Sequence, residues 1–179
     1  MKINIGAGDT KPEGFLNCDY SDLFSPDYIF DLEKDVFPFE DNSVDEVIAS
    51  HVLEHLGEGY FHCIKELYRI CKNDAIIHIK VPHFRHHNQA HDPTHRRLIT
   101  SYGLKLFDQE FNRTDNGNAS KLGLQFGVDF RIIHEHNTLD QNHPAYSKMQ
   151  HKDAQAIAEF AYGQNNVYEE SQITLKVVK

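Results

Sequence analysis

One stretch of the sequence is rich in side chains that carry protons or bind metals. Residues 82–97 contain five of the chain's 13 histidines together with three arginines. Imidazole has an unperturbed pKa of about 6.5, so a histidine here suits a general base that deprotonates an oxygen or nitrogen nucleophile. The catalytic candidates are His83, His91 and His95.

Two other interpretations of this histidine-rich stretch stay open. His87, His91 and His95 are spaced four residues apart, as a divalent-metal site on a helix would require, but Pro93 disfavours a continuous helix there. The stretch could instead be a structural lid, in which Asp92 caps a turn, His95 bonds the backbone and the arginines attract an anionic substrate. We predict no resident metal.

A glycine turn near the start of the chain is the second chemical signal. Gly6-Ala7-Gly8 follows a short apolar segment, and glycines at a strand end let the backbone approach a ligand closely. Asp19 ends the next apolar segment, where a carboxylate can accept hydrogen bonds from both ribose hydroxyls of an adenosine. The pattern predicts a nucleoside site at the carboxyl ends of two strands.

The spacing around the glycine turn does not fit two common nucleotide motifs. A dinucleotide fingerprint needs its third glycine at position 11, which is Lys11, and the P-loop pattern G-x-x-x-x-G-K-[S/T] does not occur. The 11 positions from Gly8 to Asp19 leave no room for a complete crossover helix. Either a loop replaces the first helix, or the second strand is misassigned.

Composition narrows the class of protein. The chain has 179 residues, 40% of them hydrophobic, which fits one globular domain over 1–179. The net charge of −9 argues against binding to nucleic acid or to an anionic membrane. Three well-separated cysteines, with no CxxC pair and no signal peptide, favour a reducing cytoplasm.

The elements that must position these residues alternate between strand-like and helix-like patterns. Strands are predicted at 2–5, 15–19, 43–50, 75–81 and 128–138, with a last one around 173–177. Residues 51–56 are predicted to form the beginning of a helix, and further helices are predicted at 60–72 and 152–162. Another helix is predicted to start after Ser101, which would cap it. Turns are predicted at 73–74 and 115–118, and loops at 83–97 and 140–147. This order favours an α/β architecture that ends in an antiparallel pair of strands.

Three stretches carry a family resemblance. They are Ile3-Asn-Ile-Gly-Ala-Gly8 with Gly14-Phe-Leu-Asn-Cys-Asp19; Asp31-Leu32 with residues 37–56; and Lys65-Glu-Leu-Tyr-Arg-Ile-Cys-Lys72 with 76–82. In order and spacing they resemble the class I S-adenosylmethionine-dependent methyltransferases, in their small bacterial and phage-type form. The sequence departs from the family at Thr10, where a third glycine is usual, and at Lys72-Asn-Asp-Ala75, where Lys-Pro-Gly-Gly is usual.

The resemblance implies a Rossmann-like three-layer sandwich, whose mostly parallel seven-stranded sheet ends in an antiparallel last strand. It also implies S-adenosylmethionine as the cofactor. The residues implied to bind it are Gly6, Ala7, Gly8, Asp19, Tyr20, Asp31, Leu32, Ser50 and His51. Residues 92–97 match an Asp-Pro-Thr-His-x-Arg segment of the family, so the loop 83–100 and the insertion 140–166 are expected on the acceptor side.

These observations together predict a methyltransferase that acts on a small-molecule or sugar-like acceptor by in-line displacement. The acceptor is not expected to be nucleic acid, since the chain is acidic and no Asn/Asp-Pro-Pro-Tyr signature follows the segment 43–50. Two alternatives stay open. One is a module that binds the cofactor without catalysis, and the other is a metal-dependent hydrolase built on the histidines.

Overall fold

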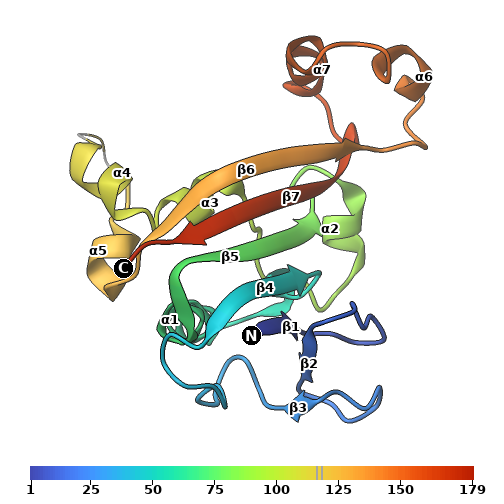
Figure 1. Ribbon diagram of the computed structural model, residues 1–179. Helices are drawn as coiled ribbons and strands as arrows, with labels where there is room; N and C mark the ends of the chain where they lie inside the picture. The colour runs from blue at the N-terminus through green and yellow to red at the C-terminus, as the bar shows by residue number, and fades with distance from the viewer. Residues whose placement is uncertain (116, 118) are drawn as a thin grey trace.

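A seven-stranded sheet lies at the centre of the computed structural model, which describes residues 1–115, 117 and 119–179 (Figure 1). Its strands are β1 (Lys2–Ile5), β2 (Leu16–Asp19), β3 (Tyr28–Ile29), β4 (Val44–Ser50), β5 (Cys71–Pro82), β6 (Phe130–Leu139) and β7 (Tyr168–Val177). The strand order is β3-β2-β1-β4-β5-β7-β6. β1 to β5 pair in parallel, and β7 pairs antiparallel with both β5 and β6. The predicted Rossmann-like sheet is therefore confirmed.

The helices are short except for one. They are η1, a 3₁₀ helix (Leu53–His55), α1 (Tyr60–Ile70), α2 (His87–His91), α3 (Ser101–Lys105), α4 (Gln109–Thr114), α5 (Leu122–Phe126), α6 (Tyr146–Met149) and α7 (Ala154–Ala161). α6 and α7 project away from the sheet beyond the end of the β6–β7 pair (Figure 1). No helix in the described residues is long and apolar enough to cross a bilayer.

The core forms on the sheet face that α1 covers. The strand register puts Ile3, Val47, Ile77 and Leu175 side by side on that face, and all four are buried. Residues three and four apart on α1 pack against them, because the apolar stripe of 60–72 is amphipathic as predicted. Aromatic side chains from α1, α5 and β6 extend the core, together with Phe107 between α3 and α4. The ring centroids of Phe61 and Phe126 are only 4.8 Å apart.

The opposite sheet face is mostly polar and partly exposed. Lys2 forms an ion pair with Glu46, and His78 Nε2 on the next strand lies 3.1 Å from the same carboxylate. Lys80 pairs with Glu170. Over the described chain we find loops, not crossover helices, between β1 and β2 and between β2 and β3.

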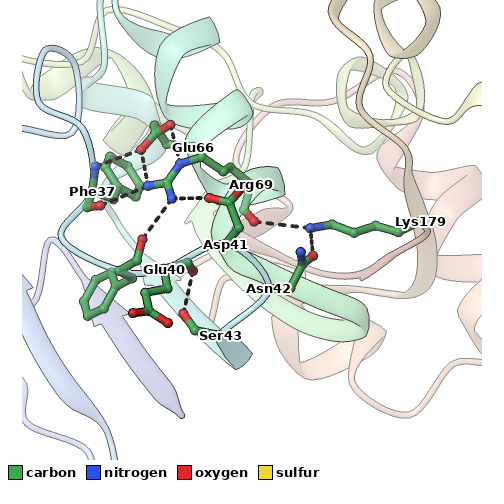
Figure 2. Close-up of polar contacts among 9 residues, drawn as sticks. Phe37, Glu40, Asp41, Asn42, Ser43, Glu66, Arg69 and Lys179 are labelled. Carbon is green, nitrogen blue, oxygen red and sulfur yellow. Dashed lines mark hydrogen bonds and ion pairs between the residues drawn. The ribbon is translucent and has the colours of Figure 1, made fainter.

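The segment between β3 and β4 is held to α1 by one guanidinium group (Figure 2). Nη2 of Arg69 donates to the Phe37 carbonyl at 2.9 Å and to Glu66 Oε2 at 2.7 Å, and Nη1 donates to the Phe39 carbonyl at 2.9 Å. Glu66 Oε2 also accepts from the Phe37 backbone N–H at 2.8 Å. These bonds fix the backbone of residues 37–39, which follow the predicted cofactor residues Asp31 and Leu32.

Several predicted boundaries need correction. The helix expected from 51–56 is only the 3₁₀ helix η1, because His51 takes a positive φ of +53° that breaks a regular helix. The turn at 73–74 lies inside β5, at a register irregularity against β4 where Asp74 has φ +62°. The helix after Ser101 is divided into α3 and α4, capped by Thr100 and Asp108.

Three further predictions concern connections. The loop 83–97 contains the short helix α2, which ends before Pro93. A loop does replace the first crossover helix, so the second strand is correctly assigned and its alternative is ruled out. The turn predicted at 115–118 includes Asn116 and Asn118, which lie outside the described residues.

Candidate functional site

A cavity of about 550 Å³ opens at the carboxyl ends of β1, β2 and β4. Seven of the nine predicted cofactor residues line it: Gly6, Gly8, Asp19, Tyr20, Asp31, Leu32 and His51. The other two, Ala7 and Ser50, sit beside lining residues but do not line it themselves. Parallel strands bring these residues together although they lie up to 45 positions apart, because their carboxyl ends share one sheet edge.

The glycine turn is fixed by hydrogen bonds to the end of β2. Ala7 N–H donates to the Cys18 carbonyl at 3.0 Å, and Gly8 N–H donates to Asp19 Oδ2 at 2.9 Å. Gly6 and Gly8 have φ of +57° and +52°, a region that glycine enters without a side-chain penalty. Oδ1 of Asp19 accepts from Ser21 N–H at 3.0 Å, so its carboxylate is held at both oxygens.

Asp31 lines the cavity and also caps its own turn. Its carboxylate accepts from the Glu33 backbone N–H at 2.8 Å and from Lys34 Nζ at 2.6 Å. The hydrogen bond from Lys34, followed by the one from Glu33, lowers the pKa of Asp31 below its usual value. The Asp31 side chain is therefore a charged carboxylate whose orientation is fixed by its own turn, and it faces the cavity in that orientation.

A second cavity, of about 530 Å³, lies on the other side of His51. Two of the three predicted catalytic histidines, His91 and His95, line it, together with Asp92, Glu169 and Glu170. His51 lines both cavities, so its side chain marks the place where they meet.

His51 is held in this position by two acidic residues. Its Nε2 lies 2.9 Å from Glu170 Oε1 and its Nδ1 lies 3.3 Å from Glu54 Oε1. Glu54, with a further contribution from Glu170, raises the pKa of His51 above its usual value. The backbone N–H of His51 donates to the Lys80 carbonyl at 2.8 Å, so the turn after β4 stays attached to β5.

Comparison with known proteins agrees with this fold. Residues 12–79 match the family model described as a methyltransferase domain. The fold resembles a SAM-dependent methyltransferase from Archaeoglobus fulgidus, with TM-score 0.61, 18% identity, and 98% of this chain and 85% of that chain covered. It also resembles the YcgJ protein from Bacillus subtilis, with TM-score 0.58, 14% identity and coverage of 99% and 91%. It is similar as well to an S-adenosylmethionine-dependent methyltransferase from Mesorhizobium loti, with TM-score 0.54, 12% identity, and 98% of this chain and 89% of that chain covered. Among curated proteins, none matches this chain in sequence.

Residues 12–79 carry the signature of a methyltransferase domain, and the whole chain has the fold of SAM-dependent methyltransferases. The resemblance read from the sequence is thus confirmed over residues 12–79 and in the fold, and that family implies S-adenosylmethionine as the cofactor. The family match begins after the glycine turn, so the assignment of Gly6 and Gly8 rests on the cavity geometry rather than on that match.

The methyltransferase domain places one predicted catalytic residue away from both cavities. His83 is only 9% exposed, and its ring packs 4.6 Å from Phe84 and 5.4 Å from Tyr168 between centroids. Burial, followed by the charges of Arg85 and His86, lowers the pKa of His83 to about 4. Its surroundings are those of a neutral packed imidazole.

The insertion 140–166 contacts the histidine-rich loop but not the cavities. Asn166 Oδ1 accepts from the His87 backbone N–H at 2.8 Å, and Asp140 Oδ2 lies 3.2 Å from His86 Nε2. Arg85 also donates to the Tyr162 carbonyl. In the described chain no residue of the insertion lines either cavity.

Several residues at the site escaped the sequence analysis. Glu33 lines the first cavity, and its Oε1 accepts from the backbone N–H groups of Gly57 and Gly59 at 2.6 and 3.0 Å. His55, Thr94 and Arg96 line the same cavity. The only signal for His55 was its place in the family-like stretch 37–56, and nothing in its spacing indicated contact with the loop 40 residues later.

Proposed function

We propose that this methyltransferase domain transfers the methyl group of S-adenosylmethionine to a small-molecule or sugar-like acceptor. The observation that carries the proposal is the pair of cavities that meet at His51, one lined by the glycine turn and Asp19 and the other by the histidine-rich loop. Methyl transfer is a displacement that needs two reactants aligned end to end, and two adjoining cavities supply that alignment.

The residues of the first cavity fit the cofactor. A Cβ built on Gly8 would meet nothing within 4 Å, so open space lies directly beside this backbone. Both oxygens of Asp19 are oriented by backbone N–H groups and retain lone pairs for ribose hydroxyls. S-adenosylmethionine supplies an electrophilic methyl group on a positively charged sulfur. Gly6 and Gly8 would contact its methionine part, Asp19 its ribose, and Asp31 with Leu32 its adenine.

The acceptor would occupy the second cavity. Its lining combines His91 and His95 with Asp92 and Glu170, which suits a neutral polar molecule such as a sugar better than a polyanion. Among the predicted catalytic histidines, His91 is the exposed one at this cavity and the one we propose to take the proton that the acceptor loses. The whole chain would act as one domain, with 83–100 and 140–166 on the acceptor side.

Calorimetry with S-adenosylhomocysteine tests the cofactor half of this proposal. The parent protein should bind one equivalent, and Asp19→Ala should weaken that binding by about 10-fold or more, as the loss of charge-assisted hydrogen bonds predicts. Asp22→Ala is the matched control, because Asp22 is exposed and lies outside both cavities. Absence of binding to the parent protein would contradict the proposal.

A methyl-transfer screen tests the catalytic half. Radiolabelled S-adenosylmethionine is incubated with panels of sugars and small hydroxylated or amino metabolites, and label transfer is measured. With an acceptor that the parent protein methylates, the His91→Asn variant should show a lower turnover at saturating substrate. Cofactor binding without transfer to any panel would favour the alternative, a module that binds the cofactor without catalysis.

A further inference from the structure

The most unusual buried group in the molecule is the carboxylate of Glu54. Its side chain is 0% exposed, and neither of its oxygens has a hydrogen-bond partner among the described residues. A buried carboxylate without such partners is strongly unfavourable unless a positive charge compensates it. His51 Nδ1 lies 3.3 Å from Oε1, but the other oxygen has no ion-pair partner among the residues that the structure describes.

Two histidines face this carboxylate from different parts of the chain. One ligand atom each from Glu54, His55 and His95 lie within 4.8 Å of one another, and the imidazole rings of His55 and His95 have centroids 4.6 Å apart. The backbone N–H groups of Arg96 and Arg97 donate to the Glu54 carbonyl at 2.8 and 3.1 Å. These two bonds attach the histidine-rich loop to η1 and bring His95 to this position.

The hydrogen bonds of both histidines use Nδ1, so Nε2 is available as a ligand atom; Nε2 of His95 lies 3.9 Å from Asp92 Oδ2, beyond hydrogen-bond distance. Nδ1 of His95 lies 3.0 Å from the Gln89 carbonyl, which can only accept, so Nδ1 carries the proton. Nδ1 of His55 lies 2.8 Å from Thr94 Oγ1, whose own proton goes to Asp92 at 2.6 Å. Nδ1 of His55 is therefore also the donor. Metal-binding histidines are held in just this way, by partners that fix the tautomer.

We propose that Glu54, His55 and His95 bind a divalent transition-metal ion of the Zn²⁺ class at the junction of the two cavities. Two imidazole nitrogens and one carboxylate oxygen are a ligand set that such ions accept, with further positions left open. Metal–ligand bonds of about 2 Å require the three donors to approach one another by small rotations of the side chains. This set differs from the helical triple His87, His91 and His95, which α2 does not continue far enough to form.

The site would serve the acceptor side of the reaction. His55 and Thr94 line the first cavity and His95 lines the second, so an ion held by these histidines would lie between the two cavities. A divalent cation there would bind and polarise an oxygen of the acceptor. This role, but not the metal site itself, rests on the proposed function.

Metal titration of tag-free, EDTA-dialysed protein tests the site. Zn²⁺ should bind with a stoichiometry of one, measured by calorimetry in competition with a chelator and by elemental analysis after dialysis. Glu54→Gln and His95→Asn should each weaken binding by more than about 100-fold, because loss of a ligand exceeds the roughly 10- to 100-fold cost of losing a supporting partner. The control His91→Asn, in the same loop, should bind Zn²⁺ like the parent protein.

Two results would overturn the proposal. The first is less than one equivalent of Zn²⁺ bound to the parent protein. The second is binding that persists in His95→Asn but disappears in His91→Asn, since it would identify a different set of ligands. Far-UV circular dichroism in EDTA verifies that each variant folds. Co²⁺ gives an independent signature, because the visible absorption of a four- or five-coordinate ion should appear in the parent protein and vanish in His55→Asn.

The same samples separate this proposal from the proposed function. S-adenosylhomocysteine binding is measured in EDTA, where the metal site is empty and the cofactor cavity is intact. Retained nucleoside binding with no Zn²⁺ binding would overturn the metal site alone. Zn²⁺ binding without nucleoside binding would overturn the proposed function and leave the metal site standing.

Discussion

Two glycines of one turn have the same backbone conformation but different surroundings. A Cβ at Gly6 would overlap the side chain of Val52, whereas a Cβ at Gly8 would enter open space. Gly6→Ala should therefore combine backbone strain with overpacking and lower the free energy of unfolding by about 2–4 kcal/mol. Gly8→Ala should lower it by only about 1 kcal/mol, from strain alone.

The glycine pair can be compared in urea unfolding and in calorimetry. Gly8→Ala should bind S-adenosylhomocysteine more weakly than the parent protein, because its new methyl group would occupy space beside the ligand, while its unfolding midpoint falls less than that of Gly6→Ala. Equal destabilisation by the two substitutions would contradict the packing described for Val52.

His83 gives a second prediction at the scale of single residues. Its pKa is about 4 in the folded protein, chiefly because of burial, against about 6.5 when unfolded. As the pH falls through this window the unfolded chain takes up a proton that the folded protein does not, so stability is present above pH 6.5 and is lost on acidification. His83→Gln should show a smaller fall in unfolding midpoint between pH 7 and pH 4.5, and exposed His151→Gln should behave like the parent protein.

Among the elements, the link between α1 and the segment before β4 depends on Arg69. Its planar guanidinium serves two backbone carbonyls and Glu66 at once, as Figure 2 shows. A lysine cannot match that geometry, so Arg69→Lys should lower the free energy of unfolding by about 1–3 kcal/mol. Arg113→Lys is the control, since Arg113 bonds only Gln109 in the described chain. Urea unfolding of both variants is the measurement, and equal stability would show that the charge alone suffices.

The sequence was most informative where elements are amphipathic or end at a recognisable residue. The helix near 60–72 and the strands around 2–5, 15–19 and 43–50 follow from apolar periodicity, and the structure has all of them. β3 could not be predicted, because it has only two residues and both are exposed. The short η1 replaces the expected helix because His51 has a positive φ. The contacts of His51 with β5 and Glu170 lie far along the chain, so local sequence does not reveal this conformation.

In the candidate site, too, residues set by regular elements could be predicted, whereas residues set by long-range contacts could not. Residues at strand ends could be placed in advance, since parallel pairing brings strand ends together whatever the loops do. Glu54 and His55 meet the histidine-rich loop through backbone bonds between residues 54 and 96–97 and through the bond from His55 to Thr94, and these long-range contacts leave no pattern in the sequence.

At the scale of the whole molecule, the insertion between β6 and β7 is attached by a narrow base. Asp140 N–H donates to the Val167 carbonyl at 2.9 Å, so the two ends of the insertion are already adjacent. Replacing residues 141–166 with an Asn-Gly turn should therefore leave the sheet folded and S-adenosylhomocysteine binding unchanged. Methyl transfer should fall, because the histidine-rich loop loses its bonds to Tyr162 and Asn166.

Thermal unfolding, calorimetry and the methyl-transfer assay measure the three outcomes of this excision. A second version with a six-residue Gly-Ser linker controls for strain in the short turn. A folded variant that no longer binds S-adenosylhomocysteine would show that the insertion belongs to the cofactor side.

The place of β7 in the sheet constrains how the protein can be synthesised. β6 pairs with β7 and with no other strand in the described chain, and β7 fills the gap between β6 and β5. On the ribosome β6 therefore emerges first and must wait, with its backbone hydrogen-bonding groups unpaired, until 28 further residues have followed and the next strand can enter. During that interval the nascent chain exposes a strand edge, and we expect this stage to be the one most dependent on chaperones.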